Sequence, residues 1–230
     1  MKHLIPLAFA AFASLTAPVA AQSPVVVELF TSQGCSSCPP ADRLLHELAK
    51  RDDVIALALH VDYWDYIGWK DEFADPSYAN RQRGYAVEGG RRSIYTPQMI
   101  INGTTDIVGA RPLQLSEAIA QHASNASPVA LDVARDGTQV SISATAEGGD
   151  GPFLVHMVHY QAERSANITR GENAGHTISY ANVTEGWKIL TEWDGVTDLS
   201  MNATADADMP VVVMIQKGRH GAILAAAQLR

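Results

Sequence analysis

The sequence predicts an α/β domain that carries a Cys-x-x-Cys motif, followed by an all-β antiparallel sandwich. In the first half, apolar β-branched runs alternate with segments of helical periodicity. In the second half, short apolar runs are separated by turn residues. The only two cysteines, Cys35 and Cys38, lie where the first predicted strand gives way to the first predicted helix.

The first 21 residues have the pattern of a secretory signal peptide. Lys2 provides a basic start, residues 4–17 carry no charge, and small residues precede an expected cleavage between Ala21 and Gln22. A membrane anchor would need about 20 apolar residues and is less favoured. We therefore expect an exported protein, periplasmic or secreted, with no stable membrane span.

The composition limits the classes of partner. A net charge of −8 gives no clustered basic surface for phosphates, so nucleic acid is not expected as a partner. An apolar fraction of 47% suits a globular protein with a core of its own. No motif in the chain calls for a cofactor.

The elements of the first half follow in a regular order. A buried-type strand over Val25–Phe30 is followed by a polar loop and the cysteine motif. Pro39 and Pro40 suit a first helical turn, and apolar residues at helical spacing continue to Lys50. The later elements expected here are a strand over 54–61, a helix near 78–87, a strand over 98–101 that turns at Asn102-Gly103, a returning strand over 106–108, and a helix over 112–123.

The pattern of the second half predicts only strands and turns. About seven strands are expected, over residues 129–134, 139–145, 153–160, 176–183, 187–193, 210–216 and 222–229. We place a domain boundary near Pro128, which gives an α/β domain over 22–127 and a sandwich over 128–230.

Three segments resemble a family of bacterial secreted proteins known as domain-of-unknown-function family 1223. They are the string from Val25 to Asp42, the triplet Thr96-Pro97-Gln98, and the segment from Arg170 to His176. The first string also resembles the opening of thioredoxin-like proteins. The resemblance implies a thioredoxin-like α/β fold for the first domain and names no substrate.

The cysteine motif favours thiol–disulfide chemistry on protein thiols. A disulfide that closes so short a loop adds only about 2 kcal/mol of stability by loop entropy, so stability alone explains it poorly. The start of a helix favours a thiolate, and we expect Cys35, nearer to solvent, to be the nucleophile and Cys38 to resolve the mixed disulfide. A structural disulfide, or copper or zinc binding by Cys35, Cys38 and His60, remains open as an alternative.

Supporting roles are assigned by the resemblance and by position. The resemblance implies that Thr96 precedes a cis Pro97 opposite the cysteines. This sequence departs from the thioredoxin pattern at Gly34, where a tryptophan is usual. Glu28 is the only acid on the first strand and serves either as a proton acceptor for Cys38 or as part of a polar edge.

The polar, glycine-containing segment 170–176 has two interpretations. It is either a surface turn or a loop that packs against the cysteines and restricts access to them, through Arg170, Glu172, Asn173 or His176. The aromatic run 63–69 similarly either packs in the interior or forms a rim for a client chain.

Overall fold

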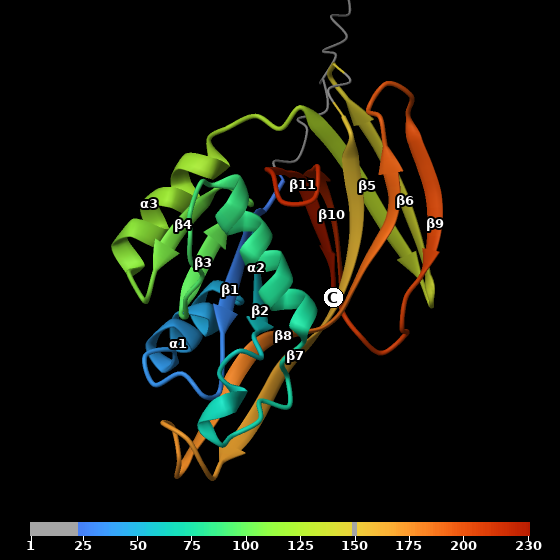
Figure 1. Ribbon diagram of the computed structural model, residues 1–230. Helices are drawn as coiled ribbons and strands as arrows, with labels where there is room; N and C mark the ends of the chain where they lie inside the picture. The colour runs from blue at the N-terminus through green and yellow to red at the C-terminus, as the bar shows by residue number, and fades with distance from the viewer. Residues whose placement is uncertain (1–22, 149–150) are drawn as a thin grey trace, which may run out of the picture.

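The computed structural model describes residues 23–148 and 151–230 (Figure 1). The expected signal peptide lies outside these residues. The first half contains β1 (Val25–Thr31), α1 (Pro39–Leu48), β2 (Val54–His60), a 3₁₀ turn at Asp65–Ile67, α2 (Pro76–Glu88), β3 (Gln98–Ile101), β4 (Thr105–Val108) and α3 (Pro112–Ala123). The second half contains β5 (Val129–Asp136), β6 (Gln139–Ala146), β7 (Phe153–Ile168), β8 (His176–Trp193), β9 (Leu199–Thr204), β10 (Val211–Lys217) and β11 (Ile223–Leu229).

Local signals account for most helix starts and turns. Proline occupies the first turn of each of the three helices in the described part of the chain. Asp75 caps α2 by accepting a hydrogen bond from Ser77 N at 2.7 Å. Asn102 and Gly103 have φ values of 43° and 73°, as a tight turn between β3 and β4 requires. None of the described helices is long and apolar enough to cross a bilayer.

The strands form one large mixed sheet and one small one. The large sheet has eight strands in the order β11-β10-β7-β8-β2-β1-β3-β4, and the small sheet has three in the order β5-β6-β9. β1 pairs with β2 in parallel and with β3 antiparallel. β8 pairs with the free side of β2 in parallel, at Ala58 and Val183.

The expected fold, a thioredoxin-like α/β domain followed by a separate sandwich, is therefore wrong. The protein is mostly β, and four strands of the second half continue the sheet of the first half. The physical reason lies at β2, whose outer backbone groups need partners once the strand is buried. β8 supplies them, and Asn182 Nδ2 also donates to Ala56 O at 2.8 Å. Two of the expected strands are one continuous β8, and β9 was not expected.

The helices cover both faces of the first part of the large sheet. Val25, Val27 and Leu29 of β1 pack with α1 and α3, whereas Val26 and Phe30 pack with α2 on the opposite face. The alternation of side chains along a strand produces this division. A third core lies between the small sheet and the strands β7, β10 and β11, seen to the right in Figure 1.

The long β7–β8 hairpin connects the two halves of the protein. It crosses the molecule from the small sheet to the end where β1 leads into α1 (Figure 1). Its tip, residues 169–175, contains Gly171 and Gly175, which have φ values of 78° and 84°. A segment far along the sequence therefore lies beside the cysteine loop.

Candidate active site

Cys35 and Cys38 form a disulfide at the start of α1. Their Cα atoms are 5.4 Å apart, and Cys38 is the residue that precedes the first helical turn. The amides of Ala41 and Asp42 donate to Cys38 O at 2.8 and 3.1 Å. Both cysteines are fully buried, at 0% exposure. The expectation that Cys35 lies nearer to solvent is therefore not met in this closed arrangement.

The tip of the β7–β8 hairpin covers the cysteine loop. Asn173 Nδ2 donates to Gln33 O at 2.8 Å and to Cys35 O at 3.0 Å, and Asn173 is itself buried. Glu172 Oε2 accepts from Ser36 N at 3.1 Å and from Ser36 Oγ at 2.6 Å. The structure thus brings two residues of the segment 170–176 onto the motif, whereas the side chains of Arg170 and His176 are exposed.

Close packing of the aromatic run completes the cover. A Cβ atom on Gly171 would lie 3.3 Å from both Ile67 Cδ1 and Trp69 Cβ, so the tip sits directly against this run. A Cβ atom on Gly34 would lie 3.1 Å from Ile67 Cδ1 and Trp64 Cβ. A side chain at either glycine would require its neighbours to shift by a few tenths of an ångström, and at Gly171 the φ value of 78° also disfavours one.

Asp42 is a buried carboxyl group on α1, four residues after Cys38, that the sequence patterns above did not single out. Thr31 Oγ1, at the end of β1, donates to Asp42 Oδ1 at 2.7 Å, while Oδ2 has no partner among the described residues. Burial raises the pKa of Asp42 to about 7, against the opposing effects of the Thr31 hydrogen bond and the nearby His60. The spacing from Cys38 is the signal that could have found it, since residues four apart share a helix face.

The His60 side chain pairs with Asp71 and not with the cysteines. His60 Nδ1 lies 2.7 Å from Asp71 Oδ2, and that oxygen also accepts from Gln33 N at 2.8 Å. Burial opposes ionisation of Asp71, but the charge of His60 and these hydrogen bonds lower the pKa of Asp71 overall. The pair therefore anchors the loop before Cys35 to β2.

Thr96 and Pro97 are connected to the cysteine loop by contacts of Trp64. The Thr96–Pro97 peptide bond is cis, and Trp64 Nε1 donates to Thr96 Oγ1 at 2.7 Å. Because Trp64 Cβ also lies close to Gly34, the Trp64 residue joins the proline segment to the cysteine loop. Beside it, Tyr66 is 81% exposed and stacks on Trp64 at a centroid distance of 6.4 Å.

Glu28 lies on the opposite face of the sheet from Asp42. Its Oε1 accepts from Arg81 Nε at 2.6 Å, and its Oε2 accepts from the Tyr85 hydroxyl at 2.5 Å. Both partners come from α2. The structure therefore does not bring Glu28 to Cys38 but uses it in a buried ion pair.

The described residues offer no metal centre at the cysteines. No group of three or more His, Cys, Asp and Glu side chains in residues 23–148 and 151–230 is arranged to hold an ion. Nε2 of His60 has no hydrogen-bond partner there, but its Nδ1 is committed to Asp71. The copper or zinc alternative gains no support from this geometry.

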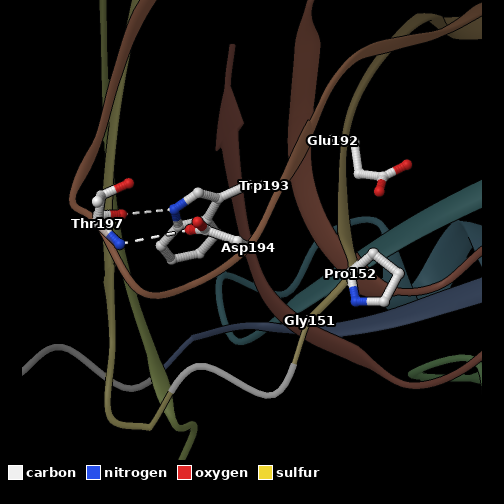
Figure 2. A pocket seen from close by; sticks show the side chains of 6 residues that line it. All are labelled: Gly151, Pro152, Glu192, Trp193, Asp194 and Thr197. Carbon is white, nitrogen blue, oxygen red and sulfur yellow. Dashed lines mark hydrogen bonds between the residues drawn. The ribbon is translucent and has the colours of Figure 1, made fainter.

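Two cavities of the described chain lie away from the disulfide. One of about 590 Å³ is lined by Gly151, Pro152, Glu192, Trp193, Asp194 and Thr197 (Figure 2). In it Trp193 Nε1 donates to Thr197 O at 2.7 Å, and Asp194 Oδ1 accepts from the amides of the turn that follows it. Another, of about 1030 Å³, runs along β5 and β11. Neither includes a cysteine.

Comparison with known proteins gives a family and a related structure. The chain is 30% identical to a protein from Agrobacterium tumefaciens of known crystal structure, with a TM-score of 0.77 over 89% of this chain and 93% of that one. No curated protein matches the sequence. The model of one family, described as "Protein of unknown function (DUF1223)", matches residues 26–216. The chain therefore belongs to the DUF1223 family.

Proposed function

We propose that the protein exchanges thiols and disulfides with other exported proteins through Cys35 and Cys38. The observation that carries the proposal is the position of the disulfide, at a helix start and next to the buried, protonatable Asp42. A helix start favours a thiolate, and a carboxyl group whose pKa is near 7 can both give and take a proton at neutral pH.

The proposed reaction with a dithiol proceeds in two displacements. A thiolate of the dithiol attacks Cys35 Sγ, the disulfide bond breaks, and Cys38 leaves with the electron pair and takes the proton of Asp42. The second thiolate of the dithiol then attacks the sulfur already bonded to Cys35 and releases Cys35 as a thiolate. The pair gains the electrons that the dithiol loses. The reverse sequence oxidises a client, and Asp42 then accepts the proton of Cys38.

Access to Cys35 requires the hairpin tip to move. Cys35 is fully buried, and a nucleophile must approach its sulfur in line with the disulfide bond. The tip is held by Asn173 and Glu172, and the Ser36 contacts of Glu172 are exposed to solvent. We propose that this movement limits which client chains reach the thiols.

Export of the protein is part of the same proposal. The apolar N-terminal segment has the pattern of a signal peptide, and a disulfide persists most readily in an oxidising compartment. The proposed location is periplasmic or secreted, and the proposed partners are protein thiols or disulfides together with an unidentified redox partner.

Equilibration with mixtures of reduced and oxidised glutathione tests the proposal. We expect the folded protein to convert reversibly between disulfide and dithiol, as measured by acid quench, alkylation and mass spectrometry. The Cys38→Ser variant should form a mixed disulfide with glutathione faster than the matched Cys35→Ser variant. A pair that is reduced only on unfolding, or a faster reaction of Cys38, contradicts the proposal.

A further inference from the structure

A carboxylate from the second half of the chain is held at the peptide group that joins Cys35 to Ser36. Glu172 Oε2 accepts hydrogen bonds from the backbone N–H and from the hydroxyl of Ser36, at 3.1 and 2.6 Å. Ser36 N is bonded to the carbonyl carbon of Cys35. Only three bonds, from that carbon through Cα and Cβ to Sγ, then separate it from the sulfur. Asn173, next to Glu172, bonds Cys35 O and fixes the tip in place.

The Glu172 side chain is ionised at neutral pH. Its pKa is lowered by the hydrogen bonds from the Ser36 hydroxyl and amide. The negative charge therefore lies at the residue after Cys35, where it opposes a second negative charge on the Cys35 sulfur. Ser37 Oγ lies 3.4 Å from Cys35 Sγ.

We propose that Glu172 tunes the redox balance of the pair, because its carboxylate disfavours the Cys35 thiolate and thereby favours the disulfide. The inference rests on the proposed exchange function and adds its regulation by the β7–β8 hairpin. Like charges close together disfavour ionisation, and the effect weakens with salt when the charges are near the surface.

The other titratable side chains near the cysteine loop are unaltered when only Glu172 is substituted. Asp42 N donates to Cys38 O, Asp71 Oδ2 accepts from Gln33 N, and His60 pairs with Asp71. Asp65 Oδ1 in turn accepts from Asp71 N. The hairpin itself adds two exposed groups, Arg170 and His176. A neutral substitution at Glu172 therefore isolates one charge in this setting.

Linkage makes the effect reciprocal. If the docked Glu172 disfavours the thiolate, then formation of the thiolate must weaken the docking of Glu172 by the same factor. Reduction at a pH above the thiol pKa should therefore loosen residues 169–175, whereas oxidation should fasten them over the disulfide.

Glu172→Gln tests the inference in the full-length protein. The amide oxygen of Gln can still accept from Ser36, so the substitution removes the charge and keeps the contact. In a Cys38→Ser background we expect the pKa of the Cys35 thiol, measured from the pH dependence of alkylation, to fall by about half a unit to one unit. Glu117→Gln on the exposed side of α3 is the matched control and should leave the thiol pKa unchanged.

The intact pair should show the same effect in its redox equilibrium. At a pH above the thiol pKa, Glu172→Gln should favour reduction by roughly threefold to tenfold, where tenfold corresponds to about 30 mV. The difference should vanish well below the thiol pKa, because no thiolate then forms, and it should shrink at 1 M salt.

Hydrogen exchange of residues 169–175 provides the second readout. We expect faster exchange in the reduced than in the oxidised wild-type protein, and a smaller difference in Glu172→Gln. If exchange with glutathione proceeds but Glu172→Gln matches Glu117→Gln in thiol pKa and equilibrium, the inference is wrong while the proposed function stands. If the wild-type pair does not exchange with glutathione at all, the proposed function itself fails.

Discussion

At the scale of single residues, Asp42 carries the most unusual environment of the candidate site. One of its oxygens is held by Thr31, and the other has no partner among the described residues. A carboxyl group in this position resists ionisation, because burial removes the water that would stabilise its charge. It therefore links the acid–base chemistry of the site to the stability of the fold.

Asp42→Asn should change how stability depends on pH. In the unfolded chain Asp42 ionises near pH 4, whereas in the folded protein it keeps its proton until about pH 7. The folded state binds more protons than the unfolded state in this pH window. The contribution of Asp42 to the free energy of unfolding is therefore largest below pH 4 and is lost as the pH rises to 7. The loss is on the order of 4 kcal/mol and should be absent from the variant.

Urea unfolding at several pH values between 4 and 8 measures this difference. The contribution of Asp71, whose pKa is lowered, should be common to both proteins and cancel in the comparison. Asp132→Asn, an exposed change on β5, should unfold like the wild type throughout. Parallel pH profiles for Asp42→Asn and the wild type would refute the raised pKa.

At the scale of elements, the β7–β8 hairpin covers the loop that carries the disulfide. Its two strands pair from Phe153 and Trp193 at one end to Ile168 and His176 at the other, so its tip is carried far from the small sheet. Near that end Ile168, Tyr180 and Val183 pack with Phe73 in an apolar cluster. The arms are therefore held by apolar packing, whereas the tip is held by the hydrogen bonds of Glu172 and Asn173 and by the contact of Gly171 with the aromatic run.

Asn173→Ala should speed reduction of the disulfide by dithiothreitol. The substitution removes hydrogen bonds to Gln33 O and Cys35 O, each worth about 1 kcal/mol net. Together the two bonds contribute about 2 kcal/mol, so the open state of the tip should become roughly thirtyfold more populated, and the rate of reduction should rise by a similar factor. Asn167→Ala, an exposed change on β7, is the matched control. Equal rates in the two variants would show that the tip does not limit access.

At the scale of the whole molecule, the two halves share the large sheet and one of its apolar clusters. Ile55 and Leu57 of β2 pack in the same apolar cluster as Val158 of β7 and Val212 of β10. The second half therefore completes the hydrogen bonding and burial of β2. The domain boundary near Pro128 stays a prediction about sequence organisation.

Truncation after Ser127 should produce a chain that does not stay monomeric. Loss of β8 exposes the backbone of β2, and loss of β7 and β10 exposes the apolar face that includes Ile55. An unpaired apolar edge is a template for aggregation. Size-exclusion chromatography with light scattering should detect oligomers of the fragment under conditions in which the full-length protein is monodisperse. A monomeric fragment that unfolds cooperatively would contradict this expectation.

The amino-acid sequence by itself determined most of the local elements and the central pair of residues. Proline positions predicted where α1 and α3 begin, Asn102-Gly103 predicted the turn between β3 and β4, and the isolated Cys35 and Cys38 predicted the disulfide. These features depend on neighbours within a few residues, so their signals are readable along the chain.

Only the tertiary structure decided which strands share a sheet and which side chains meet at the disulfide. β8 joins β2, Glu172 and Asn173 reach the cysteine loop, and Glu28 turns away to Arg81. These contacts join residues separated by about 50 to 140 positions. Partner choice at such separation depends on burial and on unpaired backbone groups in the folded sheet, which local periodicity does not encode.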